Sequence, residues 1–574
     1  MIANAQRRSD FAFLLAFFFI NLVGVMLALS ALSFAVGISI SPVHFPLSII
    51  IALVTNYFLS ARYYFVKDNA VFLRSVLLIV GLSIVSFLIA GYFFDSSIDG
   101  QTYHQNTIIQ LKNGWNPFHQ ELPADMQFSI WLNHYGKGAE IPQAVVYAFF
   151  NKIETGKATN FFLFLGAFFL TVSLLFKFNR FTTFKVYLLA AILTFNPVIL
   201  VQLLSYCIDS HLALMLQCLF LLGCFLLIDK DKFKLWLLPA VIIIALNIKF
   251  TAIIFVGVLV IGILVTLLYR KDVAQFKKVF ITAALATFAA IAVVGYNPYV
   301  TNTVDHKNPF YPLAGKGKID IMTRNSPMGF PKNNRFHNLF TSLFSRTANM
   351  LLPQTDQPQL KVPFTFKMQE MRFSYEEDIR IGGFGVLFSG IIILSLILAI
   401  FTIRQLSKPT RALLAFMIGT ILVSVFIFEY SWWARYAPQI WFLPIIILAF
   451  SEICTGTPVK WVRNITYVLI VLNLCLLGAV SLFKNLVATQ KTKYQLAELK
   501  TLKDTVTVDF DIYTDSRLKF TENNIPFKEA KLDSASVNFP MKYIHAMVHL
   551  KTQPQPLPQP YLFKLDEVLK SKSH

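Results

Sequence analysis

Long apolar stretches recur along the whole chain, and they constrain its fold more than any other feature. A helix crosses the hydrocarbon of a bilayer with about 20 mostly apolar residues. Thirteen stretches come near that length, and they are 11–36, 45–61, 75–94, 158–176, 186–206, 207–228, 235–248, 250–269, 279–296, 385–403, 412–428, 437–453 and 464–483. They predict an all-α polytopic membrane protein with about 13 transmembrane helices. The first stretch is too long for a secretory signal peptide, and further spans follow it.

The composition excludes a soluble or disordered chain. Hydrophobic residues make up 56% of the 574 residues and charged residues 14%, whereas soluble domains have about 45–50% and about 25%. The formal net charge is nevertheless +20. The position of these positive charges therefore becomes the main evidence on topology.

The loops between the stretches divide the charge unevenly. One alternate set contains 20 Lys and Arg against six Asp and Glu, at 1–10, 62–74, 177–185, 229–234, 270–278, 404–411 and 452–463. The short loops of the other set have only Lys249 and Arg435 as cations. Because cation-rich loops stay in the cytoplasm, we expect a cytoplasmic N-terminus and an extracytoplasmic C-terminus. The sequon Asn464-Ile465-Thr466 would lie at the inner face, which fits a bacterial cytoplasmic (inner) membrane.

Three longer segments, 95–157, 297–384 and 484–574, are predicted to lie outside. In the last of them, 505–513 alternates like a strand and follows a predicted polar helix over 488–503, which indicates a small α/β extracytoplasmic domain. The predicted division is two extra N-terminal spans over 1–74, a core over 75–296 with the outer loop 95–157, a large outer loop over 297–384, C-terminal spans over 385–483 and the tail domain over 484–574.

The outer loop that follows the third stretch contains the first candidate site. A helix is predicted over 100–113, because Gly114 suits the position after a helix end and Pro117 prevents continuation. Asp95 and Asp99 precede this helix, where the third stretch leaves the membrane. Asp99 is explained equally well as a helix N-cap and Asp95 as a solvated loop residue. The functional interpretation is a general base, or carboxylates that hold a cation bridging a phosphate.

Further ionisable residues face the same predicted compartment from the ends of other stretches. They are Asp209, His211, Lys249, Glu429 and Arg435, with Tyr436 beside the last. Ionisable residues in membrane spans usually line a cavity or pathway, and isolated cations suit a phosphate or pyrophosphate headgroup.

Each of these residues also has a structural interpretation. Lys249 would snorkel to outer headgroups, Glu429 and Arg435 would form an ion pair, and His211 would be a buried histidine with its hydrogen bonds satisfied. Trp432 and Trp433 are predicted to belong to the interfacial aromatic belt.

The outer loop also resembles a known family. The run Asp95-x-x-x-Asp99-Gly100-Gln101-x-Tyr103-His104-Gln105, followed by Asn113-Gly114-Trp115-Asn116-Pro117 and Tyr135-Gly136-Lys137-Gly138, is similar to the first outer loop of the GT-C class of membrane glycosyltransferases. The order of a span, a helical outer loop, six further spans and a large outer loop is also similar. The chain departs from the class in its two extra N-terminal spans and in its tail.

The resemblance implies an enzyme that moves a sugar from a polyprenyl-phosphate or related lipid-linked donor to a glycan, lipid or protein acceptor at the outer face. An acidic residue at the start of this loop is the catalytic base or metal ligand of the class, which points to Asp99 and Asp95. Lys249, Arg435 and Tyr436 are then expected to bind the donor phosphate. The rest of the expected substrate cavity is Gln101, His104, Lys137, Asp209, His211 and Glu429. No metal ligand is assigned, although the class allows a divalent cation as cofactor, and no nucleic-acid partner is expected.

Two other function classes stay open. A lipid-linked glycan polymerase or ligase would also work at the outer leaflet, and Arg372 and Arg380 of the large outer loop would then matter more than Asp99. A transporter or flippase predicts paired repeats and polar residues near mid-membrane. Asn196-Pro197 in the fifth stretch is a hint of the latter, but the sequence shows no repeat.

Overall fold

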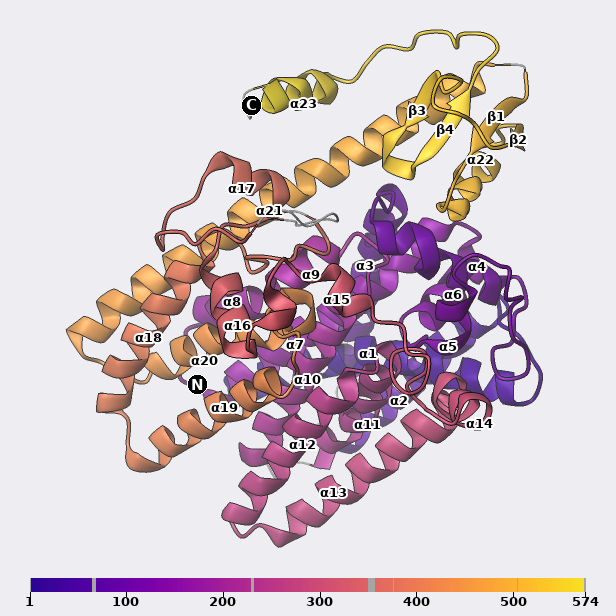
Figure 1. The fold of residues 1–574 in the computed structure, drawn as a ribbon. Helices are drawn as coiled ribbons and strands as arrows, with labels where there is room; N and C mark the ends of the chain where they lie inside the picture. The colour runs from indigo at the N-terminus through magenta and orange to yellow at the C-terminus, as the bar shows by residue number, and fades with distance from the viewer. Residues whose placement is uncertain are drawn as a thin grey trace.

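A bundle of apolar helices forms most of the molecule. The computed structural model describes residues 2–63, 69–228, 232–348, 357–374, 376–502 and 504–571. Ten helices in these ranges are long and apolar enough to cross a membrane (Figure 1), and they are α1 (Ile2–Ala35), α2 (His44–Tyr63), α3 (Asn69–Tyr92), α7 (Ala158–Phe178), α10 (Asp209–Ile228), α12 (Ala252–Tyr269), α13 (Val273–Phe288), α18 (Phe388–Gln405), α19 (Lys408–Phe426) and α21 (Thr457–Lys500). Three shorter apolar helices, α8 (Thr183–Thr194), α11 (Lys232–Ile248) and α20 (Phe442–Ser451), coincide with the remaining predicted stretches. The polytopic helical class is therefore confirmed, while the number of thirteen crossings stays a prediction.

The fifth predicted stretch is not one helix. Helix α8 ends at Thr194, and a separate helix α9 (Pro197–Gln202) follows it. Pro197 has no N–H to continue the hydrogen-bond ladder of α8, and the Asn196 side chain instead caps α9 by accepting from the Val198 N–H at 3.1 Å. The prediction of a continuous helix over 186–206 is therefore wrong.

The last predicted span is part of a much longer helix. Helix α21 runs for 44 residues to Lys500, so the polar helix predicted over 488–503 is its continuation rather than a separate element. The buried positions Leu477, Ser481, Ala488 and Leu496 recur at helical spacing along both parts. The apolar part of α21 is thus joined rigidly to the C-terminal domain.

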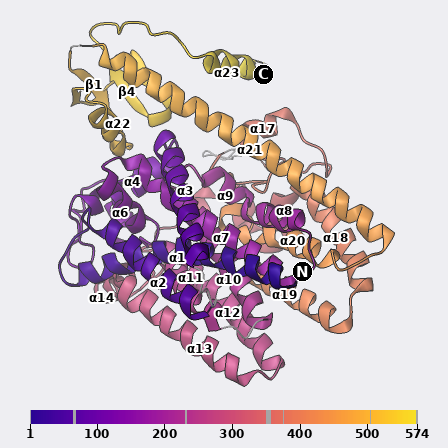
Figure 2. The ribbon, with the colours of Figure 1, turned by 180° about the vertical axis from the view of Figure 1, so that it is seen from behind.

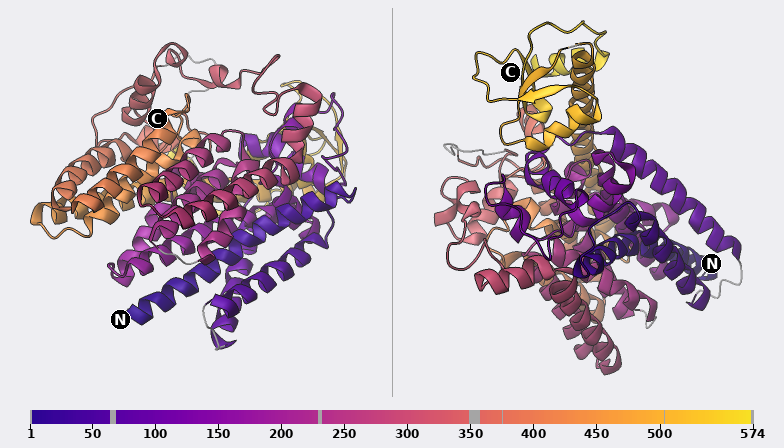
Figure 3. Two further views of the ribbon diagram at one scale, coloured as in Figure 1. Left: turned by 90° about the horizontal axis from the view of Figure 1, so that it is seen from below. Right: turned by 90° about the vertical axis from the view of Figure 1, so that its right-hand side faces the viewer.

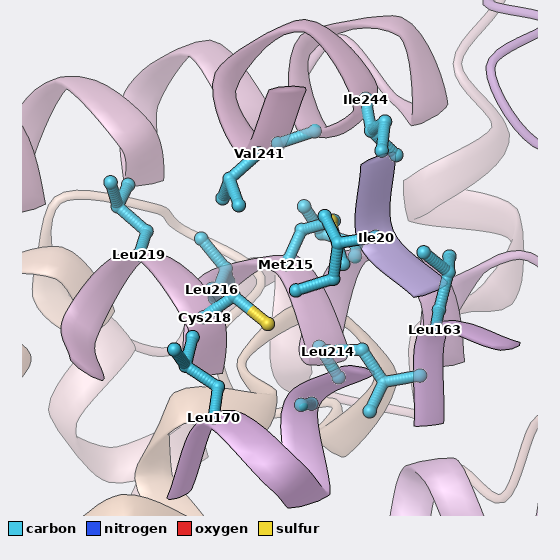
Figure 4. Close-up of a cluster of buried hydrophobic side chains, with 14 of the residues drawn as sticks. Ile20, Leu163, Leu170, Leu214, Met215, Leu216, Cys218, Leu219, Val241 and Ile244 are labelled. Atoms are coloured by element: carbon cyan, nitrogen blue, oxygen red, sulfur yellow. The ribbon is translucent and has the colours of Figure 1, made fainter. Parts of the chain in front are cut away.

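Helices α1, α7, α10 and α11 enclose the main apolar core. Figure 4 shows Ile20 of α1 among Leu163 and Leu170 of α7, the 214–219 segment of α10 and Val241 of α11. Helices α1 and α7 make the most extensive contact in the bundle. A Cβ atom at position 166 would lie 2.5 Å from Ile20 Cγ1, so Gly166 permits the close approach, as small residues do between membrane helices.

The 95–157 loop is helical, as predicted. It contains the π-helical turn η1 (Gly100–His104), α4 (Gln105–Lys112), α5 (Ser129–His134), α6 (Glu140–Phe150) and the 3-10 turn η2 (Ile153–Lys157). Gly114 has a φ of +103°, which explains why the helix predicted over 100–113 ends there. The 297–384 loop begins within η4 (Tyr296–Val300) and contains α14 (Thr301–His306), α15 (Ile321–Asn325), η5 (Phe330–Lys332), α16 (Arg335–Phe344) and α17 (Met368–Phe373).

The tail folds into a small α/β unit, also as predicted. Strands β1 (Val506–Asp509), β2 (Phe527–Glu529), β3 (Phe539–Met541) and β4 (Ala546–His549) form a sheet in the order β2-β1-β4-β3, with β1 and β2 parallel and the other pairs antiparallel. Helix α22 (Arg517–Glu522) follows β1, and α23 (Tyr561–Ser571) ends the described chain. Val508 pairs with Val548 at the centre of the sheet, and both side chains are buried.

Two cation-rich turns lie far from the tail domain at the other end of the bundle. In Figure 1 the α12–α13 turn lies at the bottom, the α18–α19 turn at the lower left and the sheet at the upper right. Figure 2 shows α1, α2 and α3 together on the face seen from behind, and in the right-hand view of Figure 3 the sheet lies above the helices of the 95–157 loop. These two cation-rich turns are thus separated in space from the tail domain, and the assignment of either end to the cytoplasm stays a prediction.

Candidate functional site

Charged side chains from four distant segments form one continuous series of contacts. Asp99 Oδ2 lies 3.0 Å from Arg435 Nη2, and Arg435 Nε lies 3.0 Å from Asp209 Oδ2. The other oxygen of Asp209 forms an ion pair with Lys249. Two carboxylates and two cations thus alternate in one network, whose charges balance.

Local structure explains how these four side chains meet. Asp209 is the first residue of α10, where the helix dipole favours a carboxylate, and Gln202 Nε2 donates to its Oδ2 at 3.1 Å. Lys249 follows the end of α11. Arg435 lies in the 3-10 turn η6 (Ala434–Tyr436) between α19 and α20, and Asp99 immediately precedes η1.

Two glycines press the 95–157 loop against the turn that contains Lys249. The Gly138 N–H donates to the Asn247 carbonyl at 2.7 Å. A Cβ atom at position 136 would lie 2.5 Å from the Asn247 carbonyl oxygen, and one at position 138 would lie 2.7 Å from its carbonyl carbon. The Tyr135-Gly136-Lys137-Gly138 motif therefore positions the α11–α12 turn, because a larger residue at either glycine would push it away.

The network borders a cavity of about 980 Å³. Its lining includes three charged residues of the network and the neighbouring tyrosine, which are Asp99, Lys249, Arg435 and Tyr436. Polar residues of the large loop and of the tail also line it, and they are Arg372, Glu376, Glu377, Asp378, Arg380, Lys484, Lys542, Tyr543, His545 and Asp566. One wall is apolar and consists of Ala479, Val480, Phe483 and Val487 of α21 with Met368 and Met371. The cavity lining thus combines charged and polar groups with an apolar face of α21.

Aromatic rings support the cations at the edge of the cavity. The Arg435 guanidinium lies 5.1 Å from the Trp433 ring centre and 5.6 Å from that of Tyr436, and Lys249 Nζ lies 4.7 Å from the Tyr436 ring centre. These are cation–π distances. Trp432 and Trp433 stack on each other and are 2% and 3% exposed, so the prediction that they form an interfacial belt is wrong.

Asp99 is the accessible carboxylate of the network. Its side chain is 30% exposed, against 1% for Asp209. Burial would raise the pKa of Asp99, but the charge of the Arg435 guanidinium and its hydrogen bond to the carboxylate outweigh burial, so the pKa lies below its usual value. Asp99 is therefore ionised at neutral pH and faces the cavity.

Asp95, the other expected catalytic residue, lies beneath the cavity instead of lining it. Its fully buried carboxylate accepts hydrogen bonds from the Ser97 N–H and hydroxyl, the Gln105 amide and the Tyr206 N–H, at 2.7–3.3 Å. A Cβ atom at position 100 would collide with this carboxylate. Burial raises the pKa of Asp95, against the charge of Lys157. The contacts of Asp95 thus hold the start of the 95–157 loop, four residues before Asp99.

Three of the expected cavity residues do not line the cavity but make buried contacts within the 95–157 loop or between it and other segments. Gln101 Nε2 donates to the carbonyls of Asp95 and Tyr543 at 2.7 and 2.8 Å. His104 Nδ1 lies 2.6 Å from Glu140 Oε1, and both side chains are buried. Lys137 Nζ donates to Asn297 Oδ1 at 2.6 Å, and burial lowers the Lys137 pKa to about 7.

Two other expected residues lie apart from the network. His211 Nε2 contacts Asn160 Oδ1 at 2.8 Å inside the bundle, and His211 does not line the cavity. Glu429 is exposed and also lies outside the cavity. The alternative ion pair between Glu429 and Arg435 is wrong, because Arg435 pairs with Asp99 and Asp209 instead.

Several cavity residues were missed in the sequence. Cys207 lies at the start of the sixth stretch, where only Asp209 and His211 attract attention, and Lys542 and His545 belong to a domain whose position depends on the direction of α21. Lys484 carries a detectable signal, because it interrupts an apolar face of α21 between Val480 and Val487.

The chain was also compared with known proteins. No protein-family model, no curated protein and no solved structure matches it.

Proposed function

We propose that the protein is a membrane glycosyltransferase that moves a sugar from a polyprenyl-phosphate donor to an acceptor on the outer face of a bacterial cytoplasmic membrane. The observation that carries this proposal is the presence of Asp99, Arg435 and Lys249 in one cavity with an apolar wall. A lipid-linked donor needs both a polar and an apolar surface, and the acceptor needs a base. The proposed orientation places the cavity end outside, because the cation-rich loops lie at the other end.

The cavity offers separate places for the two parts of the donor. The face of α21 formed by Val480, Phe483 and Val487 fits the polyprenyl chain. Lys249 and Arg435 pair with Asp99 and Asp209, and two further cavity cations also have acidic neighbours, Arg380 with Asp378 at 3.7 Å and Lys484 with Glu377 at 4.0 Å. Arg380 and Lys484 border the same space, and their side chains are 5% and 19% exposed. We assign the phosphate to the region between these two cations and Arg435.

The reaction is then a single displacement at the anomeric carbon. Asp99 accepts the proton of an acceptor hydroxyl while the acceptor oxygen bonds to that carbon. The bond from the carbon to the phosphate oxygen breaks, and the electron pair leaves with the polyprenyl phosphate. The positive charge of Arg435 holds the Asp99 carboxylate in place and stabilises the negative charge of the leaving phosphate. One displacement inverts the anomeric configuration.

The direct test is to incubate purified, reconstituted protein with polyprenyl-phosphate sugars and extracted envelope acceptors. We expect a glycosidic product and free polyprenyl phosphate in equal amounts, with inverted configuration. A transporter or flippase would move the donor across the vesicle without forming either product. A polymerase or ligase would leave single sugars untransferred and would move a preassembled glycan, and this reaction would depend on Arg372 and Arg380, both of which line the same cavity.

Donor binding is expected to weaken as the pH rises through about 7. Burial raises the pKa of Glu377 to about 7, against the charge of Lys484 at 4.0 Å. Above this pH Glu377 becomes negative, pairs with Lys484 and repels the donor phosphate. Between about one pH unit below and about one pH unit above the Glu377 pKa, the donor KM should rise by about tenfold. This corresponds to a loss of ~1.4 kcal/mol of binding free energy.

Two variants separate this effect from general pH sensitivity. Glu377→Gln should show a nearly constant donor KM over the same range, because position 377 can no longer ionise. Glu429→Gln, at an exposed position outside the cavity, should keep the wild-type profile. An unchanged profile in Glu377→Gln would rule out this group as the origin of the dependence.

A further inference from the structure

Three potential metal ligands meet outside the cavity described above. Glu121 lies in the loop between α4 and α5, His134 ends α5 and His306 ends α14. One ligand atom of each lies within 4.8 Å of the others. None of the three lines the 980 Å³ cavity, so they form a separate cluster that joins the 95–157 loop to the start of the large loop.

A buried asparagine sets the tautomer of His134. Asn302 Nδ2 donates to the carbonyls of His134 and Tyr311 at 3.1 and 2.9 Å, so its Oδ1 must act as an acceptor. This oxygen lies 2.9 Å from His134 Nδ1, which therefore carries the proton. The lone pair of His134 is left on Nε2, and the residue is only 9% exposed. A metal-binding histidine is commonly oriented in this way, through a hydrogen bond from its other nitrogen.

The backbone beside Glu121 and the ring of His306 also make defined contacts. The backbone on both sides of Glu121 is fixed, because Trp115 Nε1 donates to the Gln120 carbonyl at 2.9 Å, and the Asn133 side chain bonds both the N–H and the carbonyl of Leu122 at 2.9 and 3.0 Å. The His306 ring stacks on Tyr311 at 3.7 Å. Glu121 and His306 are themselves exposed, so their side chains can turn the short distance to a shared ion.

We propose that Glu121, His134 and His306 bind a zinc ion, with water as the fourth ligand. Two imidazoles and one carboxylate are a common ligand set for zinc, with bonds of about 2.0–2.2 Å, whereas magnesium and calcium prefer oxygen ligands. The ion joins helices α5 and α14 and thereby fastens the 95–157 loop to the segment that follows α13. This role is independent of the proposed glycosyl transfer.

Zinc titration of the full-length protein tests this proposal, provided that the protein is purified without a polyhistidine tag and stripped with a chelator. We expect one tightly bound zinc ion per chain by competition with a chromogenic chelator, and a higher Tm when zinc is added. His306→Ala and Glu121→Gln change exposed residues and should leave the fold intact. Each should lower zinc affinity more than about 100-fold, which exceeds the ~10–100-fold cost of an outer-sphere change.

His337→Ala is the matched control, because His337 is an exposed histidine at the start of α16. It should keep the wild-type affinity and the zinc-dependent rise in Tm. Substitution with Co²⁺ should give the visible absorption of a tetrahedral site with nitrogen and oxygen ligands in the wild type but not in His306→Ala. Equal zinc affinity in the wild type, His306→Ala and Glu121→Gln would overturn the proposal.

Discussion

Replacement of Arg435 by Gln is expected to lower the rate of sugar transfer by at least about 1,000-fold, because the loss of this one guanidinium affects both the position of Asp99 and the charge near the leaving phosphate. Arg435 touches both Asp99 and Asp209, at 3.0 Å each. Without it, the two carboxylates keep only Lys249 as a cation in the network, and their repulsion displaces Asp99 from its position in the cavity. The positive charge nearest the leaving phosphate is lost as well. The measurement is kcat and donor KM of the reconstituted variant.

Two further variants define what Arg435 contributes. Arg435→Lys keeps the charge but cannot contact both carboxylates through a planar fork, so we expect activity between that of the wild type and that of Arg435→Gln. Arg324→Gln changes an exposed arginine on α15, whose neighbours Met322 and Asn325 line the cavity. It should retain wild-type activity. Wild-type turnover by Arg435→Gln would refute the role of the network.

Replacement of Lys519 by Met is expected to destabilise docking of the C-terminal domain by about 3–5 kcal/mol, the usual cost of breaking a buried ion pair. Lys519 of α22 pairs with Glu154 of η2, and the two side chains are 1% and 0% exposed. Glu154 also pairs with Lys157 at 2.5 Å. The loss of Lys519 leaves the buried carboxylate under-compensated. Hydrogen exchange of β1 and β4 and the susceptibility of the tail to proteolysis should both increase.

The surface of the same helix provides the control. Arg517 contacts Glu529 at 2.6 Å, but these side chains are 47% and 41% exposed. Exposed pairs contribute about 0–1 kcal/mol, so Arg517→Gln should change exchange and proteolysis little. Equal effects of Lys519→Met and Arg517→Gln would show that the buried cluster does not hold the domain. Because the domain supplies Lys542 and His545 to the cavity, loosening it should also raise the KM for an acceptor or donor.

Apolar length explains which parts of the bundle were predictable. All thirteen stretches contain helices, because about 20 apolar residues have few alternatives in lipid. The predicted helix bounds are wrong at two kinds of place. One is where a single residue breaks an otherwise apolar helix, and the other is where a helix leaves the bundle and packs against another domain. Pro197 divides the fifth stretch despite its apolar neighbours, and α21 continues past its apolar part because its buried positions then pack against the tail domain.

The candidate site was predictable to the extent that charge in an apolar chain is informative. Asp99 is predicted from its place at the end of the third stretch and from the resemblance of its loop, and Lys249 and Arg435 are predicted as isolated cations beside membrane spans. The structure places all three in one cavity. The same reasoning could not separate Asp99 from Asp95, because their exposure depends on how the loop turns at Gly100. It also selected Glu429, which lies outside the cavity.

Long-range packing explains what the sequence did not show. Lys542 and His545 reach the cavity because α21 extends toward the sheet, and no local pattern encodes that direction. His306 is similarly far in the chain from Glu121 and His134, and long-range contacts such as that between His134 and Asn302 bring the three together. Such clusters have no fixed spacing for a motif to describe.

The most direct measurement is single-turnover transfer from a polyprenyl-phosphate sugar by the wild type, Asp99→Asn and Asp125→Asn in parallel. Asp125 is an exposed aspartate of the same loop that does not line the 980 Å³ cavity. Our account predicts that Asp99→Asn still binds the donor but forms the glycosidic bond about 100–10,000-fold more slowly, as expected for loss of a general base, while Asp125→Asn matches the wild type. Transfer at the wild-type rate by Asp99→Asn, or no transfer by the wild type with any such donor, would contradict it.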